Sequence, residues 1–398
     1  MSVPPAPAAR ATARLESIDL LRGVIVVIMA LDHTRDFFGA IGADPTNLAV
    51  ATPGLFLTRW VTHICAPVFF LLTGTGAWFS GRRRSPAGLS RYLVTRGLWL
   101  VLLEFTVVRC LGLQFNFDYQ VTILTVLWAL GWSMVALAFL SRLPVGALIV
   151  FGAALVLGHN ALDGIAPTTF GSWAPLWSAL HAPGVLWMRP GHIVIVAYTL
   201  IPWVGVTTLG YALGALFERS AEARTSFLRR AGLAFLGAFV LLRLLNGYGD
   251  PRPWTYFPSV GRTLLSFLNV SKYPPSLLFL LMTLGTACLL LAWFQRGTPG
   301  WLRPALPYGK TPLFFFLVHF FLIHTLAVIA SLARFGTAAG MFQSPTLDRF
   351  PITAPPGWDL GLPFVYLVWA TVIVVMYPLC RWYAGVRGSG KYPLLSYL

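Results

Sequence analysis

The sequence predicts an all-α fold, a polytopic transmembrane bundle of about ten helices. Of its 398 residues, 57% are hydrophobic and only 11% are charged. The hydrophobic residues gather in blocks of about 20, the length at which a helix crosses the hydrocarbon core of a bilayer. The short gaps between the blocks carry most of the arginine and lysine, which is typical of cytoplasmic loops.

Ten apolar blocks give the positions of the predicted helices. Most are long enough to cross a bilayer, and the fifth is the shortest. No internal repeat relates one half of the chain to the other. The blocks cover residues 18–38, 55–79, 92–112, 120–140, 144–158, 192–217, 228–246, 275–294, 311–333 and 362–383.

The basic residues predict that both termini are cytoplasmic. With a cytoplasmic N-terminus and an even number of helices, most of them fall in inner loops, as the positive-inside rule requires. We therefore expect one transmembrane domain, residues 18–383, between cytoplasmic tails at residues 1–17 and 384–398. The inner basic residues are Arg82, Arg83, Arg84, Arg91, Arg142, Arg219, Arg224, Arg229, Arg230, Arg296, Arg303, Lys310, Arg381, Arg387 and Lys391, and the outer ones are Arg189, Arg252, Arg262, Lys272, Arg334 and Arg349.

The net charge of +16 is explained by this topology, so the predicted partner is the lipid bilayer and not nucleic acid. The cysteines lie inside or at the ends of apolar blocks and show no C-x-x-C spacing. They therefore indicate neither a disulfide framework nor a zinc site. These cysteines are Cys65, Cys110, Cys288 and Cys380.

The first apolar block also has features of a signal peptide, because Arg10 and Arg14 precede it and the small residues 39–43 follow it. Cleavage there would remove the charged and titratable residues Asp32, His33, Arg35 and Asp36, which a signal peptide does not need. We therefore interpret this block as an uncleaved first helix.

This first helix carries polar residues at both ends of its apolar stretch. Arg22 and His33 are separated by about 16 Å along a helix axis and lie on nearly the same face. Ionisable groups are costly inside a bilayer, so their presence indicates function. The alternative is a purely structural role, in which Arg22 anchors the helix at the cytoplasmic surface and His33 lies at the opposite membrane interface.

The second and third predicted helices add further polar residues. Arg59 and His63 are four residues apart and share one helix face. Helix three carries Glu104 near its middle. When the helices are threaded in alternating directions, we expect one polar pocket in the outer third of the membrane, or an ion-paired structural core. It would contain His33, Asp36, Arg59, His63, Arg109 and Asp118.

We assign no metal site. His33 and His63 have no sequence-local partner at ligand spacing, and His319 and His324 are five residues apart, which splays them by roughly 140° around a helix. Other histidines in or beside an outer loop are individually weak signals, and no soluble-enzyme motif is present. These histidines are His159, His181 and His192.

The predicted outer loops at about 159–191, 247–274 and 334–361 are long, and long loops usually carry function. Within the second, residues 263–270 are apolar but too short to span, so we expect them to lie in the interface or to dip inward.

Five segments of the chain resemble those of one family, the bacterial membrane proteins related to heparan-alpha-glucosaminide N-acetyltransferase. The resemblance covers most of the chain and is most specific in the first third. Arg22 and His33, with ten residues between them, also match the Arg-x10-His pattern of the acyltransferase-3 membrane family. The segments that carry the resemblance are Ser17–Gly23, Leu31–Phe38, Thr62–Gly74, Asn269–Ser276 and Pro312–Phe320.

The resemblance implies a multi-pass protein of the bacterial inner membrane that moves an acetyl group from cytosolic acetyl-CoA to a hydroxyl or amine at the outer face. The implied acceptor is a small molecule or glycan, such as a sugar or glycoconjugate. A homodimer is left open. One departure matters, because residues 39–42 lack the histidine that the lysosomal enzyme carries beyond the corresponding helix. The catalytic role then falls to His33 or His63.

In the predicted mechanism, His33 acts as general base and is oriented by Asp32 or Asp36, with His63 as a second acid or base. Arg59 stabilises the developing oxyanion. A covalent acyl-histidine intermediate is an alternative course of the same reaction.

On the donor side, we expect Arg22, with Arg96 or Lys310, to neutralise the phosphates of CoA. Lys272 and His319 are expected to complete the walls of the donor site. An extended pantetheine arm would cover the roughly 16 Å between Arg22 and His33.

Two other classes of function remain as alternatives. A proton-coupled transporter or channel also uses intramembrane ionisable residues, although it would favour broken helices in two related halves. A structural or scaffold protein predicts no passage between the two faces.

Overall fold

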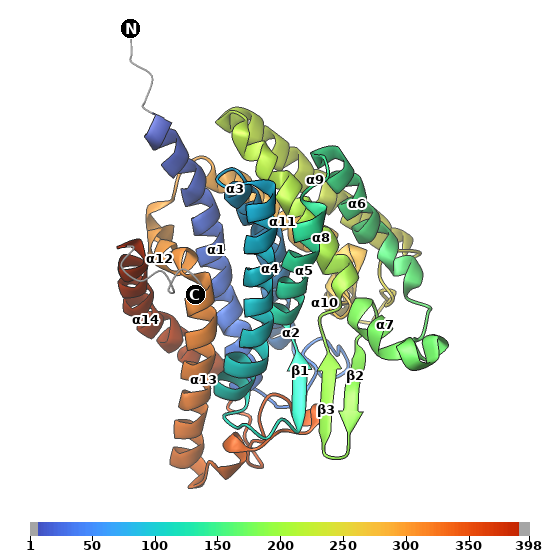
Figure 1. Ribbon diagram of the computed structural model, residues 1–398. Helices are drawn as coiled ribbons and strands as arrows, with labels where there is room; N and C mark the ends of the chain where they lie inside the picture. Colours follow the sequence, from blue (N-terminus) through green and yellow to red (C-terminus); the bar gives the residue numbers. More distant parts are fainter. Residues whose placement is uncertain (1–6, 390–398) are drawn as a thin grey trace.

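The computed structural model describes residues 7–389. Long helices run side by side and form a bundle, and a small sheet lies at one end of it (Figure 1). We call this the sheet end, and the opposite end, where α1 begins, the basic end. The outermost parts of the predicted tails, residues 1–6 and 390–398, lie outside the described residues.

Each predicted apolar block contains a long helical segment, so the helical bundle is confirmed. Within residues 7–389, six segments are long and apolar enough to cross a membrane. They are Pro53–Gly81, Val145–Leu162, Leu200–Glu218, Leu277–Phe294, Pro312–Phe335 and Gly361–Gly388. The long helices are α1 (Pro7–Phe38), α3 (Cys65–Gly81), α4 (Pro86–Leu103), α5 (Val126–Leu140), α6 (Val145–Gly158), α8 (Leu200–Gly214), α9 (Ala221–Leu245), α11 (Leu277–Phe294), α13 (Pro312–Phe335) and α14 (Gly361–Gly388).

Shorter elements connect the long helices. The helix before α3 is α2 (Pro53–Val61), which is joined to it by the 3-10 turn η1 (Thr62–Ile64), and α4 continues into the π-helix η2 (Glu104–Leu113). The others are η3 (His159–Leu162), η4 (Pro167–Trp173), α7 (Ala174–Leu180), η5 (Ala215–Glu218), α10 (Val260–Leu268), η6 (Gly300–Ala305), α12 (Leu306–Lys310), η7 (Ala339–Phe342) and η8 (Leu347–Arg349).

The sequence prediction missed a three-stranded sheet. Its strands are β1 (Val121–Leu124), β2 (Gly184–Arg189) and β3 (His192–Val196), in the order β1-β3-β2. β1 runs parallel to β3, and β2 forms an antiparallel hairpin with β3. The predicted blocks 120–140 and 192–217 each begin with one of these strands. Both strands are rich in β-branched residues, which favour extended backbone, but their apolar side chains were merged with the helices that follow them.

The short apolar segment in the second outer loop forms α10, which is too short to span, as expected. Leu265 of α10 packs in a small cluster with Phe56 of α2 and Leu48. This segment therefore covers α2 and does not cross the bundle.

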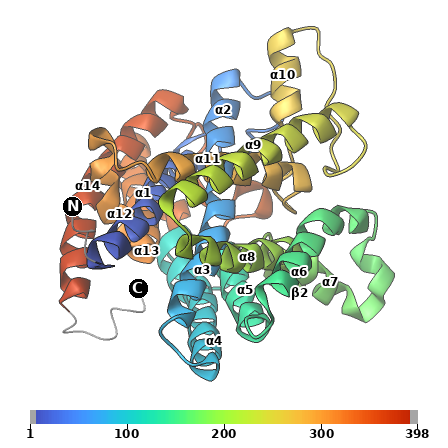
Figure 2. The same ribbon diagram turned by 90° about the horizontal axis from the view of Figure 1, so that it is seen from above.

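Helix α1 lies between α12, α13 and α14 on one side and the rest of the bundle on the other (Figure 2). It packs against α3 and α11 on one side and against α12, α13 and α14 on the other. Many of its apolar side chains, such as Ile18, Leu21 and Ile25, are fully buried. A helix in this position contacts protein and not lipid, which explains how it can carry charged residues through the bundle.

Close contacts between helix backbones hold α1 in place. A Cβ atom added to Gly23 would lie 2.0 Å from the carbonyl oxygen of Ala305, and one added to Gly309 would lie 1.7 Å from that of Asp19. Small residues allow such contacts in membrane bundles, where lipid is as apolar as the helix surface and tight packing drives association. Gly23 of the Leu-Arg-Gly motif therefore has a packing role.

Two hydrogen bonds locate the ends of α1 and α14 relative to each other. At the sheet end, the indole nitrogen of Trp358 donates to the carbonyl oxygen of Phe37 at 2.8 Å. At the basic end, Nη1 of Arg387 donates to the carbonyl oxygen of Lys310 at 3.1 Å. The described start of α1 and the described end of α14 therefore lie on the same side of the bundle.

Replacing Gly23 by Ala should destabilise the protein by about 1–3 kcal/mol, because the new methyl group would overlap a backbone carbonyl that cannot move away. The matched control is Gly237→Ala in α9, where no atom lies within 4 Å of the added Cβ. That change should be neutral or stabilise the helix by up to about 1 kcal/mol. Thermal unfolding in detergent measures both, and equal melting temperatures for the two variants would contradict the packing role of Gly23.

Candidate active site

The last two turns of α1 carry a cluster of ionisable residues at the sheet end. Nη2 of Arg35 donates to Oδ1 of Asp32 at 2.9 Å and to Oδ1 of Asp36 at 2.6 Å. Nη1 of Arg59, on α2, donates to Oδ2 of Asp32. Both oxygens of Asp32 are therefore bound by guanidinium groups, and this ion cluster joins α1 to α2.

His33 contacts another histidine and not the carboxylates beside it. Its Nδ1 lies 2.7 Å from Nε2 of His319 on α13. Nδ1 of His319 in turn lies 2.9 Å from the carbonyl oxygen of Phe315. The structure does not show the predicted contact between His33 and Asp32 or Asp36. Both oxygens of Asp32 and Oδ1 of Asp36 bind arginine side chains instead.

These contacts determine the tautomers of the neutral histidine pair. A carbonyl oxygen can only accept, so Nδ1 of His319 carries a hydrogen and its Nε2 has a lone pair. Nδ1 of His33 must then donate to that lone pair. The remaining nitrogen of His33, Nε2, is left with a lone pair that can accept a proton or attack a carbonyl carbon.

His63 lies in η1, between α2 and α3, and its side chain is buried. Its ring centroid is 5.4 Å from that of Phe279 on α11. Nδ1 of His63 has no hydrogen-bond partner among the described residues. This histidine is available to bind a ligand in the cavity that it lines.

The predicted site residues line two adjoining cavities. The outer cavity, of about 350 Å³, is lined by residues that include Asp36, Arg59, His63, Lys272 and Tyr273. The middle cavity, of about 30 Å³, is lined by Asp32, His33, Cys65, Tyr198, Lys272, Phe69 and Phe316, among others. Lys272 borders both cavities. The structure therefore brings four of the six residues of the predicted pocket to two neighbouring cavities, with His33 at the middle one and Asp36, Arg59 and His63 at the outer one.

Two tyrosines that the sequence analysis did not single out complete the walls. Tyr198 borders the middle cavity and Tyr273 the outer one, with ring centroids 5.4 Å apart. Burial raises the pKa of Tyr198. Burial also acts to raise the pKa of Tyr273, but the positive charges of Lys272 and Arg59 outweigh it and lower that pKa. Tyr273 lies in the Lys-Tyr-Pro-Pro stretch of the family-like segment 269–276, which was the sequence signal that could have identified it.

Arg22 lines a third cavity, of about 250 Å³, nearer the basic end. Arg96, Tyr92 and Phe69 also line it, whereas Lys310 is not among its described lining residues. Nη1 of Arg22 donates to Oδ1 of Asp19 at 3.0 Å. Phe69 borders both this basic-end cavity and the middle one, so the three cavities follow one another through the bundle. The middle cavity has room for about one water molecule and is too narrow for a pantetheine arm.

Arg109 and Asp118 form a separate cluster, contrary to the prediction that they share the pocket. Nη2 of Arg109 donates to Oδ1 of Asp118 at 2.9 Å and to Oγ of Ser344 at 3.1 Å. Burial acts to raise the pKa of Asp118, but hydrogen bonds from Ser344 and the Gln120 amide and the contact with Arg109 outweigh it, so the pKa is lowered. The cluster ties η2 to the loop near Ser344 and does not line the three cavities within the described residues.

Glu104 has a structural role that the sequence analysis did not identify. Its carboxylate accepts hydrogen bonds from the amide and hydroxyl of Thr125 at 2.8 and 2.6 Å. It also accepts from the amides of Leu127 and Trp128 at 3.0 and 3.2 Å. A carboxylate at this position compensates the free amides and positive dipole end of α5.

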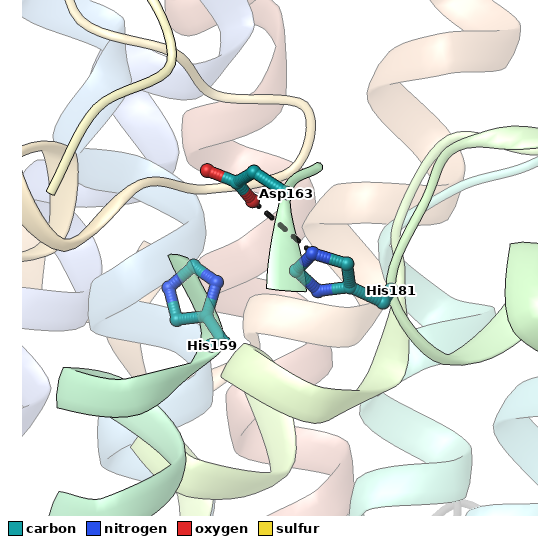
Figure 3. Close-up of side chains that lie close together, drawn as sticks. All are labelled: His159, Asp163 and His181. Carbon is teal, nitrogen blue, oxygen red and sulfur yellow. Dashed lines mark hydrogen bonds and ion pairs between the residues drawn. The ribbon is translucent and has the colours of Figure 1, made fainter. Parts of the chain in front are cut away.

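The structure also brings together three residues that we assigned no joint role, His159, Asp163 and His181 (Figure 3). His159 and Asp163 are four residues apart, and this spacing was the available sequence signal. His181 follows α7 and could not be connected to them from spacing.

One comparison with known proteins identifies a similar family. The family model for the catalytic domain of heparan-alpha-glucosaminide N-acetyltransferase matches residues 14–243. The matched range contains Arg22, Asp32, His33, Arg59 and His63, and it ends before Lys272 and His319. No curated protein matches the chain.

Replacing Asp32 by Ala should destabilise the protein by about 3–5 kcal/mol, because two buried guanidinium groups would lose their shared counter-ion. The matched control is Asp36→Ala. The side chain of Asp36 is 39% exposed, against 9% for Asp32, and a partly solvated pair contributes about 1 kcal/mol or less. Thermal unfolding in detergent compares them. A loss for Asp36→Ala as large as that for Asp32→Ala would show that the cluster does not depend on Asp32.

Proposed function

Because the chain belongs to the heparan-alpha-glucosaminide N-acetyltransferase catalytic-domain family, we propose that this membrane acetyltransferase-like protein takes its acetyl group from cytosolic acetyl-CoA. The acceptor is a hydroxyl or amine, in our proposal of a sugar or glycoconjugate, and it binds in the outer cavity. The observation that carries this proposal is the His33–His319 pair, which leaves a lone pair on Nε2 of His33, a residue that lines the middle cavity together with Lys272.

In the proposed reaction, Nε2 of His33 removes the proton of the acceptor hydroxyl or amine. The acceptor oxygen or nitrogen forms a bond to the thioester carbonyl carbon, and the carbonyl oxygen becomes negatively charged. The bond to sulfur then breaks, and protonated His33 returns its proton to the CoA thiolate. The products are the acetylated acceptor and free CoA.

Positive charge near the two cavities would stabilise the oxyanion. Arg59 lines the outer cavity, but Asp32 already binds its Nη1. Lys272 borders both cavities, so in our proposal it shares this role with Arg59. His63 and Asp36 lie in the outer cavity and would position the acceptor, with His63 as the second acid or base.

The donor would enter from the basic end. Arg22 and Arg96 line the basic-end cavity and would neutralise the phosphates of CoA. The pantetheine arm would then pass Phe69 to reach His33. Since the middle cavity holds only about 30 Å³, Phe69 has to move aside when the donor binds.

A proton-coupled transporter is the second candidate, and one observation favours it. Cavities of about 350 and 250 Å³ lie on either side of the narrow middle cavity, as alternating access requires. Acetyl-CoA hydrolysis or acetyl transfer by the purified protein would support the transferase and exclude a pure transporter. In either case we place the protein in the bacterial cytoplasmic membrane.

His33→Ala should lower acetyl transfer by about 100-fold or more, because the general base is lost, while the melting temperature changes little. His63→Ala should lower the rate of acetyl transfer less than His33→Ala does, because His63 is the second acid or base in the proposed reaction. His192→Ala is the control, since His192 lies on β3 outside the cavities. The rates are measured as release of free CoA. Wild-type rates for both His33→Ala and His63→Ala would place the chemistry elsewhere in the protein.

Arg22→Ala should weaken the binding of acetyl-CoA by about 10- to 100-fold, since a charge-assisted hydrogen bond to phosphate contributes about 1.5–3 kcal/mol. Arg82→Ala is the control, because Arg82 is exposed and pairs with Glu218 at the surface. Isothermal titration calorimetry in detergent measures both affinities. Unchanged affinity in Arg22→Ala would identify this residue as an anchor paired with Asp19.

A further inference from the structure

His159, Asp163 and His181 lie close together (Figure 3). None of the three lines the outer, the middle or the basic-end cavity. His159 begins η3 directly after α6, Asp163 directly follows η3, and His181 directly follows α7. One potential ligand atom from each side chain lies within 4.8 Å of those of the other two. Two elements separated in sequence therefore place two imidazoles and one carboxylate around a common point.

The hydrogen bonds in this cluster leave buried nitrogen atoms unused. Nε2 of His181 lies 3.1 Å from Oδ1 of Asp163. His159 is 1% exposed, yet neither Nδ1 nor Nε2 has a hydrogen-bond partner among the described residues. Nδ1 of His181 is also buried without a partner among these residues. Burying an imidazole without any partner is unfavourable, so the hydrogen bonds among the described residues do not explain the burial of His159.

We propose that His159, Asp163 and His181 bind a divalent zinc ion, with an open coordination position for water. Two imidazoles and one carboxylate are a common ligand set for zinc, whereas calcium and magnesium prefer oxygen ligands alone. Two ligands of a tetrahedral zinc ion lie about 3.3 Å apart, and Asp163 and His181 already match this separation. A rotation of the unpaired His159 ring completes the set.

The surroundings of Asp163 suit a metal ligand. Nδ2 of Asn160 donates to its Oδ2 at 2.7 Å and so orients the carboxylate. Such outer contacts hold ligands in position around metal ions.

The same contacts connect the cluster to the rest of the bundle. Oδ1 of Asn160 accepts from the amide of Leu277, the first residue of α11, at 2.8 Å. The indole nitrogen of Trp177 donates to the carbonyl oxygen of Ile165 at 2.9 Å and fixes α7 beside η3. A bound ion would therefore brace α6, α7 and the start of α11 against one another.

The test uses the full chain without a histidine tag, purified in detergent and stripped with a chelator. After incubation with zinc chloride and removal of excess metal, we expect one zinc ion per chain by atomic absorption. Zinc should raise the melting temperature of the stripped protein. Cobalt in place of zinc should give the visible absorption bands of a four-coordinate site.

The main variant is His159→Leu, with His192→Ala as the matched control. Because His159 has no partner in the stripped protein, His159→Leu should be at least as stable as the wild type without metal. It should bind zinc more than about 100-fold more weakly and lose the zinc-dependent shift. His192→Ala should retain both.

Equal zinc content in the wild type and in a His159→Leu/His181→Leu double variant would overturn the proposal. So would a zinc-dependent shift of the same size in His159→Leu. Zinc content and melting temperature do not depend on acetyl transfer, so these results stand whether or not the proposed reaction is correct.

Discussion

The carboxylate of Asp32, bound by Arg35 and Arg59, is the interaction on which the rest of the site depends. Charges inside a membrane bundle are tolerated only when they are paired and shielded from lipid. Asp32 neutralises two guanidinium groups and joins α1 to α2. Because Arg59 and His63 lie on consecutive turns, this ion cluster also fixes the outer cavity, and it leaves His33 free to pair with His319.

The central position of α1 makes this arrangement available. Gly23 and Gly309 let α1 and α12 approach until their backbones touch, which packs α1 inside a ring of helices. Ser17, Asp32, Thr34 and Arg35 of this helix are then buried among protein side chains. Arg22 borders one cavity and His33 another, and Phe69 lies between these cavities. In the proposed reaction, the donor passes Phe69 on its way to His33.

The sequence by itself determined the helices, the common side of the described ends of α1 and α14, and the polar residues of α1 and α2. These features are encoded locally, because a span needs about 20 apolar residues and four residues complete about one helical turn. The resemblance in the first third of the chain agrees with the matched family. The strands β1 and β3 were missed because short β-branched runs are indistinguishable from helix ends when they adjoin an apolar block.

Only the tertiary structure decided which side chains meet. His33 pairs with a residue 286 positions away, Arg109 turns to Asp118 and Ser344, and His181 joins His159 and Asp163. The partner of a side chain on a bundle helix depends on the rotation of that helix and on how closely its neighbours pack. Spacing along one helix contains no information about either, so sequence patterns identified the polar residues but not their contacts.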